Sequence, residues 1–246
     1  MIPAKVINKE LLSSNIAHVY LRPLRRLVDP IPGQFIMLWI PDYEEVPMSI
    51  SGYSGGLLRV TVKARGPTTG YIVKDLPIGS YVGIRGPLGV GVTEELVRGK
   101  GLLISGGIGI APILYLVNKY NNLLKESKLI AGFSTNDESR LIRSITHKID
   151  VDVVTEEGPN GCTVVDLLTR KYLGIVTNYD YYLVSGPKAV LDQVVKLMPT
   201  NMRGYVLAES LIKCGLGFCG SCALRNLLVC RDGPLVRADH YRWLIS

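Results

Sequence analysis

The pattern of hydrophobic residues changes near Lys100, and this change limits the folds open to the chain. Residues 1–99 contain short stretches rich in β-branched and aromatic residues, separated by Gly and Pro. Residues 58–63 alternate apolar with polar side chains, as a half-buried antiparallel strand does, and residues 34–40 and 81–84 are also predicted strands. Such spacing predicts a small antiparallel β-barrel in the first half of the chain.

The half that begins at residue 100 alternates short apolar runs with segments of helical pattern. Strands that alternate with helices along a chain are typical of a parallel sheet covered by helices, so we predict an α/β domain. The predicted strands are 101–105, 129–133, 151–155, 181–185 and 205–208, and the predicted helices are 112–125, a segment after Asp137, 164–171 and 187–198.

Four cysteines near the C-terminus have the spacing C-x4-C-x2-C-x7-C, with glycines between them. A 2Fe-2S cluster takes four thiolates, and C-x4-C-x2-C with a later fourth cysteine is the plant-type ferredoxin order, although the last spacing there is longer. Gly215, Gly217 and Gly220 permit the φ > 0 turns that a loop around inorganic sulfide requires. The predicted iron ligands are Cys214, Cys219, Cys222 and Cys230.

Two other interpretations of the cysteines stay open. Tetrahedral zinc also takes four cysteines, but its sites usually consist of two short pairs separated by a longer stretch. Disulfides are disfavoured because five cysteines in 246 residues do not make a disulfide scaffold. The fifth cysteine, Cys162, stands alone in the sequence, and we expect it to be a packed side chain rather than a ligand.

Composition and charge fit a globular protein of two domains of ordinary size. The 28 basic and 21 acidic residues give a net charge of +7, but no block of five or six like charges occurs, so we expect no nucleic-acid partner. The uncharged stretch 101–117 is shorter than the roughly 18 residues of a membrane-spanning helix. Nothing at the N-terminus resembles a secretory signal, so we expect a cytoplasmic protein with no membrane segment.

Three glycine-containing or hydroxyl-containing turns are candidate nucleotide sites. Residues 106–112 follow an apolar strand and precede a helical pattern, and their glycines allow a pyrophosphate to approach the backbone. Residues 47–50 and 66–70 offer hydroxyls and turn N–H groups that suit phosphates or a ring edge. Each is also explained as an ordinary turn or a tight packing corner.

Further motifs accompany these turns in a fixed order along the chain. The order is Pro32-Gly33-Gln34-Phe35, Pro47-Met48-Ser49, Thr68-Thr69-Gly70, Gly86-Pro87-Leu88-Gly89, Gly106-Gly107-Ile108-Gly109-Ile110-Ala111-Pro112, Glu156-Glu157-Gly158, Val165-Asp166-Leu167-Leu168, Gly186-Pro187, Glu209, the four cysteines and Asp232-Gly233-Pro234. In this combination the sequence resembles the ferredoxin-NADP reductase superfamily and, within it, the electron transfer subunits of dihydroorotate dehydrogenase B, over essentially its whole length.

The resemblance implies three functional parts. Residues 1–99 would form an antiparallel FAD-binding β-barrel, residues 100–208 a parallel α/β domain that binds NAD, and residues 209–246 a small 2Fe-2S segment. A flavin is needed between the other two because NAD exchanges two electrons at once, whereas the cluster exchanges one. The implied cofactor-binding residues are Pro47, Met48, Ser49, Val62, Lys63, Ala64, Thr68, Thr69, Gly70, Gly106, Gly107 and Gly109.

The resemblance also implies a partner. Dihydroorotate would be oxidised on a catalytic subunit that contains FMN, in a heterotetramer of two subunits of each kind, so we nominate no general acid or base in this chain. Three positions depart from the family: Val46 replaces a usual Arg, Ser185 replaces a frequent Cys, and the loop from Cys222 to Cys230 is short. Two alternatives stay open: a subunit of an NAD(P)H-ferredoxin or sulfur-metabolism oxidoreductase, and a zinc-stabilised module without catalytic function.

Overall fold

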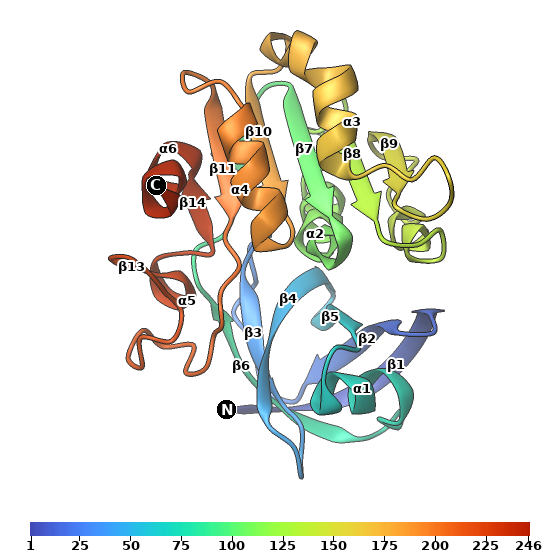
Figure 1. Ribbon diagram of the computed structural model, residues 1–246. Coiled ribbons are helices and arrows are strands. Elements are labelled where there is room, and N and C mark those ends of the chain that lie inside the picture. The colour runs from blue at the N-terminus through green and yellow to red at the C-terminus, as the bar shows by residue number, and fades with distance from the viewer.

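The first half of the chain closes into a six-stranded antiparallel barrel in the computed structural model, which describes residues 1–246 (Figure 1). The barrel order is β1-β2-β5-β4-β3-β6, and the pairing of β1 with β6 closes it. The predicted strands at 34–40, 58–63 and 81–84 are confirmed. The strands are β1 (Ile2–Ser13), β2 (Ile16–Pro23), β3 (Phe35–Trp39), β4 (Glu45–Ser54), β5 (Leu57–Lys63) and β6 (Tyr81–Leu88).

The barrel interior is filled by apolar side chains from every strand. On β5, Leu58, Val60 and Val62 are buried in one hydrophobic cluster, as the alternating pattern predicts. The helix α1 (Pro67–Lys74) follows β5 directly and adds Ile72 and other apolar side chains to the same cluster. The barrel is therefore a packed scaffold rather than an open channel.

The second half forms a six-stranded sheet in the order β14-β11-β10-β7-β8-β9. All five predicted strands are confirmed, and they pair in parallel. The sheet is mixed rather than wholly parallel, because a sixth strand from the C-terminal segment pairs antiparallel with β11. The strands are β7 (Gly101–Gly106), β8 (Lys128–Phe133), β9 (Asp150–Thr155), β10 (Tyr181–Ser185), β11 (Arg203–Leu207) and β14 (Leu235–Arg237).

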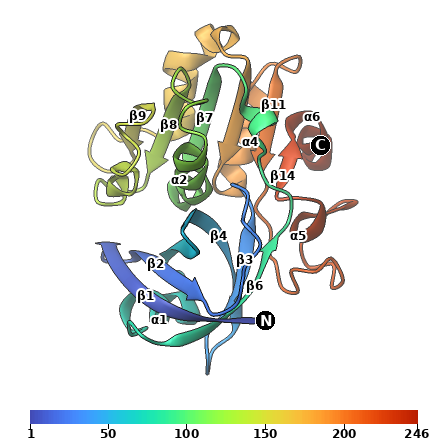
Figure 2. The ribbon, with the colours of Figure 1, turned by 180° about the vertical axis from the view of Figure 1, so that it is seen from behind.

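Helices cover both faces of this sheet. In Figure 1, α3 (Val164–Leu167) and α4 (Lys188–Leu197) lie in front of the strands, and Figure 2 shows α2 (Ile110–Lys119) on the opposite face. Alternate residues of β10 enter two separate core clusters, one with α4 and one with α2. None of the helices is long and apolar enough to cross a membrane.

Two predicted helices are shorter than expected. The helix predicted over 112–125 ends at Lys119, shortly before Asn121 and Asn122, a residue type of low helix propensity. The helix predicted after Asp137 is only the 3-10 helix η3 (Glu138–Ile142), where the Ser139 hydroxyl donates to a backbone carbonyl and so favours a turn.

The helix predicted over 164–171 is irregular, since α3 passes into a π-helical turn and then a 3-10 helix. The predicted helix 187–198 agrees with α4. The remaining short elements are η1 (Glu94–Val97), η2 (Gly107–Gly109), η4 (Leu168–Tyr172), η5 (Leu173–Asn178), β12 (Ala223–Leu224), β13 (Leu227–Leu228), α5 (Val229–Asp232) and α6 (Ala238–Ile245).

The barrel meets the sheet at the carboxyl ends of the parallel strands (Figure 1). The Tyr115 hydroxyl on α2 donates to the Pro30 carbonyl at 2.8 Å, and its ring joins the hydrophobic cluster of the barrel. The Lys119 ammonium donates to the same carbonyl at 2.8 Å. Ligands of open α/β sheets bind at this edge, so the junction is the first place to look for a site.

Candidate functional site

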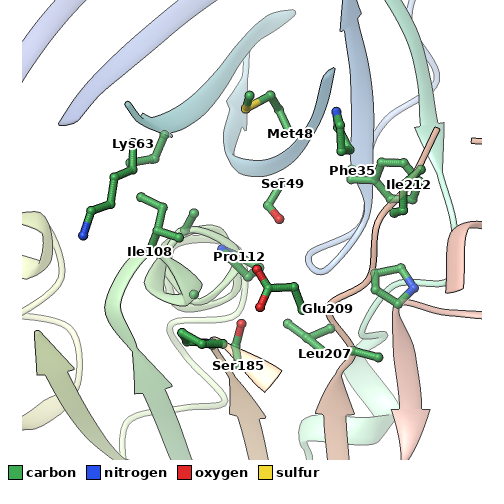
Figure 3. Close-up of a pocket in the computed structure, with 18 of the residues that line it drawn as sticks. Phe35, Met48, Ser49, Lys63, Ile108, Pro112, Ser185, Leu207, Glu209 and Ile212 are labelled. Atoms are coloured by element: carbon green, nitrogen blue, oxygen red, sulfur yellow. The ribbon is translucent and has the colours of Figure 1, made fainter. Parts of the chain in front are cut away.

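A cavity of about 290 Å³ lies between the barrel and the carboxyl edge of the sheet (Figure 3). Its volume is near the lower end of the range for small-molecule sites. Strands β3, β4 and β5 supply Phe35, Met48, Ser49 and Lys63 to one wall. The last residues of the parallel strands and the residues that follow them supply the opposite wall, including Ile108, Pro112, Ser185, Leu207 and Glu209.

Half of the cofactor residues predicted from the resemblance line this cavity. They are Pro47, Met48, Ser49, Lys63, Thr69 and Gly109. The others lie behind or beside its wall: Val62 is buried in the barrel core, and the Thr68 hydroxyl donates to Glu44 Oε1 at 2.9 Å. Ala64, Gly70 and Gly107 are next to lining residues in the chain without lining the cavity, and Gly106 lies two residues before the lining residue Ile108.

Three oxygen-bearing side chains point toward one another across the cavity (Figure 3). Ser49 comes from β4, Ser185 from the end of β10, and Glu209 from the residues just after β11. Sequence reasoning did not select Glu209 as a lining residue. Its position directly after a parallel strand was the available signal, because that edge of an α/β sheet holds ligands.

Two cationic side chains lie at the end of the cavity where α1 begins. The Lys63 ammonium is 2.6 Å from Glu138 Oε1, and this ion pair joins the barrel to the α/β half. Glu138 is almost fully buried, and its other oxygen, Oε2, has no hydrogen-bond partner. Arg65 enters the hydrogen bonds of the structure only through its backbone N–H, which donates to Thr69 Oγ1 at 2.9 Å.

A buried histidine supports the barrel wall of the cavity. Thr61 lines the cavity, and its Oγ1 is 2.8 Å from Nδ1 of His18 on β2. Burial, with a smaller effect from the nearby Arg59 guanidinium, lowers the pKa of His18 to about 3. His18 is therefore neutral at pH 7, and it orients the Thr61 hydroxyl without adding charge.

The glycine turn at 106–112 connects β7 through η2 to α2. Gly107 has φ +53, in the left-handed region. A Cβ on Gly109 would lie 2.5 Å from the backbone N and Cα of Gly186, so the turns after β7 and β10 touch there. Gly109 therefore lies at a tight packing corner between two turns, and it also lines the cavity.

The four C-terminal cysteines lie in the segment between β11 and β14, and all are free thiols. Backbone N–H groups point at their sulfurs: Gly217 N lies 3.2 Å from Cys230 Sγ, and Leu216 N lies 3.4 Å from Cys214 Sγ. Gly215, Gly217 and Gly220 have φ +69, +78 and +75, so the predicted φ > 0 turns are confirmed.

The cysteines differ in how readily they ionise. Backbone N–H groups, that of Cys219 first, lower the pKa of Cys214 to about 6, while burial raises the pKa of Cys230 to about 11. Backbone N–H groups aimed at the sulfurs of Cys214, Cys222 and Cys230 fit a 2Fe-2S cluster.

Cys162 lies outside this segment, after β9, and its thiol donates to the Thr163 carbonyl at 3.5 Å.

The cysteine segment itself forms part of the cavity wall. Glu209, Ser210 and Ile212 precede the first cysteine, and Pro234 follows the last; all four line the cavity. The two predicted cofactor sites are thus adjacent in the structure.

Comparisons with known proteins agree with this arrangement. A family model described as the iron-sulfur cluster binding domain of dihydroorotate dehydrogenase B matches residues 209–241. A protein from Pyrococcus abyssi, named "Probable dihydroorotate dehydrogenase B (NAD(+)), electron transfer subunit", is 38% identical over 217 residues, which cover 87% of this chain and 82% of the relative. A protein of the same name from Archaeoglobus fulgidus is 33% identical over 247 residues, covering 97% and 98%.

Solved structures share the fold at lower identity. The structure of an NADH-dependent reduced ferredoxin-NADP oxidoreductase, studied for flavin-based electron bifurcation, matches with a TM-score of 0.80 and 20% identity over 96% of this chain and 88% of that one. A ferredoxin NADP+ reductase from Neisseria gonorrhoeae with bound FAD and NADP matches with a TM-score of 0.63 and 17% identity, covering 79% and 89%. The fold is that of the ferredoxin-NADP reductases.

Proposed function

The chain belongs to the family of electron transfer subunits of dihydroorotate dehydrogenase B, and from this membership we propose that it carries electrons from a catalytic partner subunit to NAD+ through a 2Fe-2S cluster and FAD. The overall process would be the oxidation of dihydroorotate in the synthesis of pyrimidines. Dihydroorotate itself would be oxidised on the partner, so this chain needs no general acid or base for that step.

One observation carries the proposal: the cavity and the cysteine segment share a wall. Ile212 lines the cavity and lies two residues before Cys214. A flavin in the cavity and a cluster on the cysteines would therefore be neighbours, as electron transfer between them requires. When bound, the flavin exchanges two electrons with NAD and single electrons with the cluster.

We assign the barrel wall to FAD. Pro47, Met48 and Ser49 would border the flavin ring, and Lys63 and Arg65 would supply positive charge near its phosphates. The start of α1 adds backbone N–H groups beside Thr69. The apolar residues of the cavity, Phe35, Ile108 and Leu207 among them, would exclude water from the reacting face.

We assign the sheet wall to NAD. The turn at 106–112 lies at the N-terminus of α2, a position that favours a pyrophosphate. Ser185 and Glu209 face the barrel across the cavity (Figure 3), and the Glu209 carboxylate would favour the cationic ring of NAD+ over the neutral ring of NADH. These residues would hold the nicotinamide against the flavin, in a near-attack arrangement.

An electron transfer subunit works with a catalytic subunit, and we propose that this partner contains FMN and assembles with the chain as a heterotetramer of two subunits of each kind.

The three functional parts would be the barrel of residues 1–99 for FAD, residues 100–208 for NAD, and residues 209–246 for the cluster. Cys214, Cys219, Cys222 and Cys230 would be the four iron ligands.

Anaerobic co-expression with the FMN-containing partner tests the proposal. The purified complex is expected to contain FAD together with two irons and two acid-labile sulfides per chain, and its flavin absorption should bleach on addition of NADH. It should also reduce NAD+ when dihydroorotate is added. A stable complex that carries zinc without sulfide, or that fails to reduce NAD+ with dihydroorotate, would contradict the proposal.

A further inference from the structure

Arg85 on β6 connects the barrel to the first cysteine of the segment. Its Nη2 donates to the backbone carbonyl of Cys214 at 2.9 Å. The same guanidinium makes a two-pronged contact with Glu45 on β4, with Nε to Oε1 at 2.7 Å and Nη2 to Oε2 at 2.5 Å. Arg85 thus lies between a carboxylate and the peptide of a predicted iron ligand.

The Arg85–Glu45 pair is only partly open to solvent. The exposed fractions of the two side chains are 23% and 22%, so water screens their charges less than those of a fully exposed pair. The fork geometry also fixes the orientation of the guanidinium, because both of its bonds to Glu45 must form together. The same Nη2 atom donates to Glu45 and to the Cys214 carbonyl, so the positive charge is in direct contact with Cys214 and the carboxylate is bound to the same guanidinium.

Other contacts hold the cysteine segment against the same side of the barrel. A Cβ on Gly215 would lie 3.0 Å from the side chain of Met37 and 3.1 Å from that of Leu88, so the segment packs closely on β3 and β6. Beyond the last cysteine, the Val90 N–H donates to the Gly233 carbonyl. Both views show the segment with α5 and β13 beside β3 and β6 (Figures 1 and 2).

We propose that Arg85 and Glu45 set the reduction potential of the cluster held by the four cysteines. Arg85 is a positioning residue whose positive charge favours the reduced form, and the Glu45 carboxylate offsets part of that effect. The inference rests on the proposed function, since it requires the cluster. Reduction adds one electron, and therefore one negative charge, to the cluster. A guanidinium fixed on the carbonyl of a ligand stabilises that charge, and a carboxylate bound to the guanidinium offsets part of the effect.

Two neutral variants separate these roles. Arg85→Gln removes the cation and should lower the equilibrium constant for one-electron reduction of the cluster by about tenfold, which equals about 59 mV. Glu45→Gln removes the offsetting anion and leaves the Cys214 contact in place, so it should shift the same constant in the opposite direction. The potentials are measured on the purified complex by anaerobic titration with dithionite, following the electron paramagnetic resonance signal of the reduced cluster.

Arg59→Gln is the matched control. Arg59 is also a barrel arginine whose Nη2 donates to a backbone carbonyl, that of Ser51 at 2.6 Å, but it belongs to β5 and does not contact the cysteine segment. The potential of this variant should equal that of the unaltered protein. Opposite shifts in the two test variants, with no shift in the control, would support the proposal.

Shifts in the same direction, or potentials unchanged in both test variants, would overturn it. If Arg85→Gln does not retain its iron, Arg85→Lys and Glu45→Gln decide. The lysine keeps the full positive charge but not the two-pronged contact with Glu45, so its potential should lie less than about 59 mV below that of the unaltered protein, while Glu45→Gln must still raise the potential. Iron and sulfide contents of the unaltered protein separate the two hypotheses. An unaltered protein without a cluster contradicts the proposed function, whereas a loaded protein with unmoved potentials contradicts only the role of Arg85 and Glu45.

Discussion

Arg65 and Val46 differ in what they offer to a phosphate in the cavity. Val46 lies on β4, and its apolar side chain packs against the barrel core. Arg65 lies at the start of α1, lines the cavity, and uses no atom of its guanidinium in the hydrogen bonds or ion pairs of the structure. The guanidinium is therefore free to contact a phosphate.

Arg65→Gln should weaken FAD binding by about threefold to tenfold, since an exposed charge-assisted contact to phosphate is lost. Riboflavin has the same ring without phosphates, so its affinity should not change. Both affinities are measured by flavin fluorescence on protein stripped of its flavin. Equal losses for FAD and riboflavin would mean that Arg65 supports the ring site rather than the phosphates.

At the scale of elements, the turn between β7 and α2 depends on close contact with the turn after β10. Gly109→Ala places a methyl group against the backbone of Gly186, which cannot move aside as a side chain can. We expect a loss of about 3 kcal/mol in the free energy of unfolding. Gly107→Ala is the comparison: nothing lies within 4 Å of its added Cβ, so only its positive φ costs energy, about 1 kcal/mol.

Denaturant titrations of the two variants at matched flavin content measure this difference. The midpoint of Gly109→Ala should be clearly the lower of the two. If Gly107→Ala proves equally or more destabilising, the contact between the two turns is not what requires glycine at position 109.

The elements that the sequence predicted well are those with a strong local pattern. Strands β7 and β10 are nearly continuous apolar runs, and β5 alternates cleanly, so each is visible without knowledge of its neighbours. Strand β14 has only three residues and exists because β11 offers an edge to pair with. The contact of Arg85 with Cys214 spans 129 positions, and no local pattern records it.

The residues that line the cavity were likewise predicted only where the local sequence is distinctive. Its barrel residues were found through their composition, as for Pro47-Met48-Ser49, although these three lie within strand β4 and the turn predicted at 47–50 is wrong. Glu209 and Ile212 enter the cavity only because the chain turns back toward the barrel after β11. Helix lengths were overestimated where hydroxyl and amide side chains compete with the backbone, as at Ser139.

At the scale of the whole molecule, the ion pair between Lys63 and Glu138 holds the two halves together beside the cavity. The exposed fractions of the two side chains are 17% and 5%, so removal of the lysine leaves a buried carboxylate without its partner. Lys63→Met should reduce the free energy of unfolding by about 3 kcal/mol. Glu138→Gln should cost less, about 1 kcal/mol, because the remaining lysine is better able to reach water.

Thermal unfolding of the two variants, compared at equal concentration, checks this order. Lys9→Met provides a control, because the Lys9 ammonium donates only to backbone carbonyls within the barrel half. A larger loss of stability in Glu138→Gln than in Lys63→Met would show that a buried carboxylate without its partner is not the main cause of the destabilisation.

The cysteine segment leaves the sheet after β11 and returns to it as β14, and that return has a consequence for assembly. The pairing of Val206 with Val236 uses backbone hydrogen bonds, and α6 packs on the sheet in a hydrophobic cluster that also contains Cys222 and Cys230. Both ends of the segment are thus anchored by the folded sheet. Two of the four predicted iron ligands are thus part of the core that the sheet shares with α6, so we expect the uptake of iron and the final packing of this half of the molecule to influence each other.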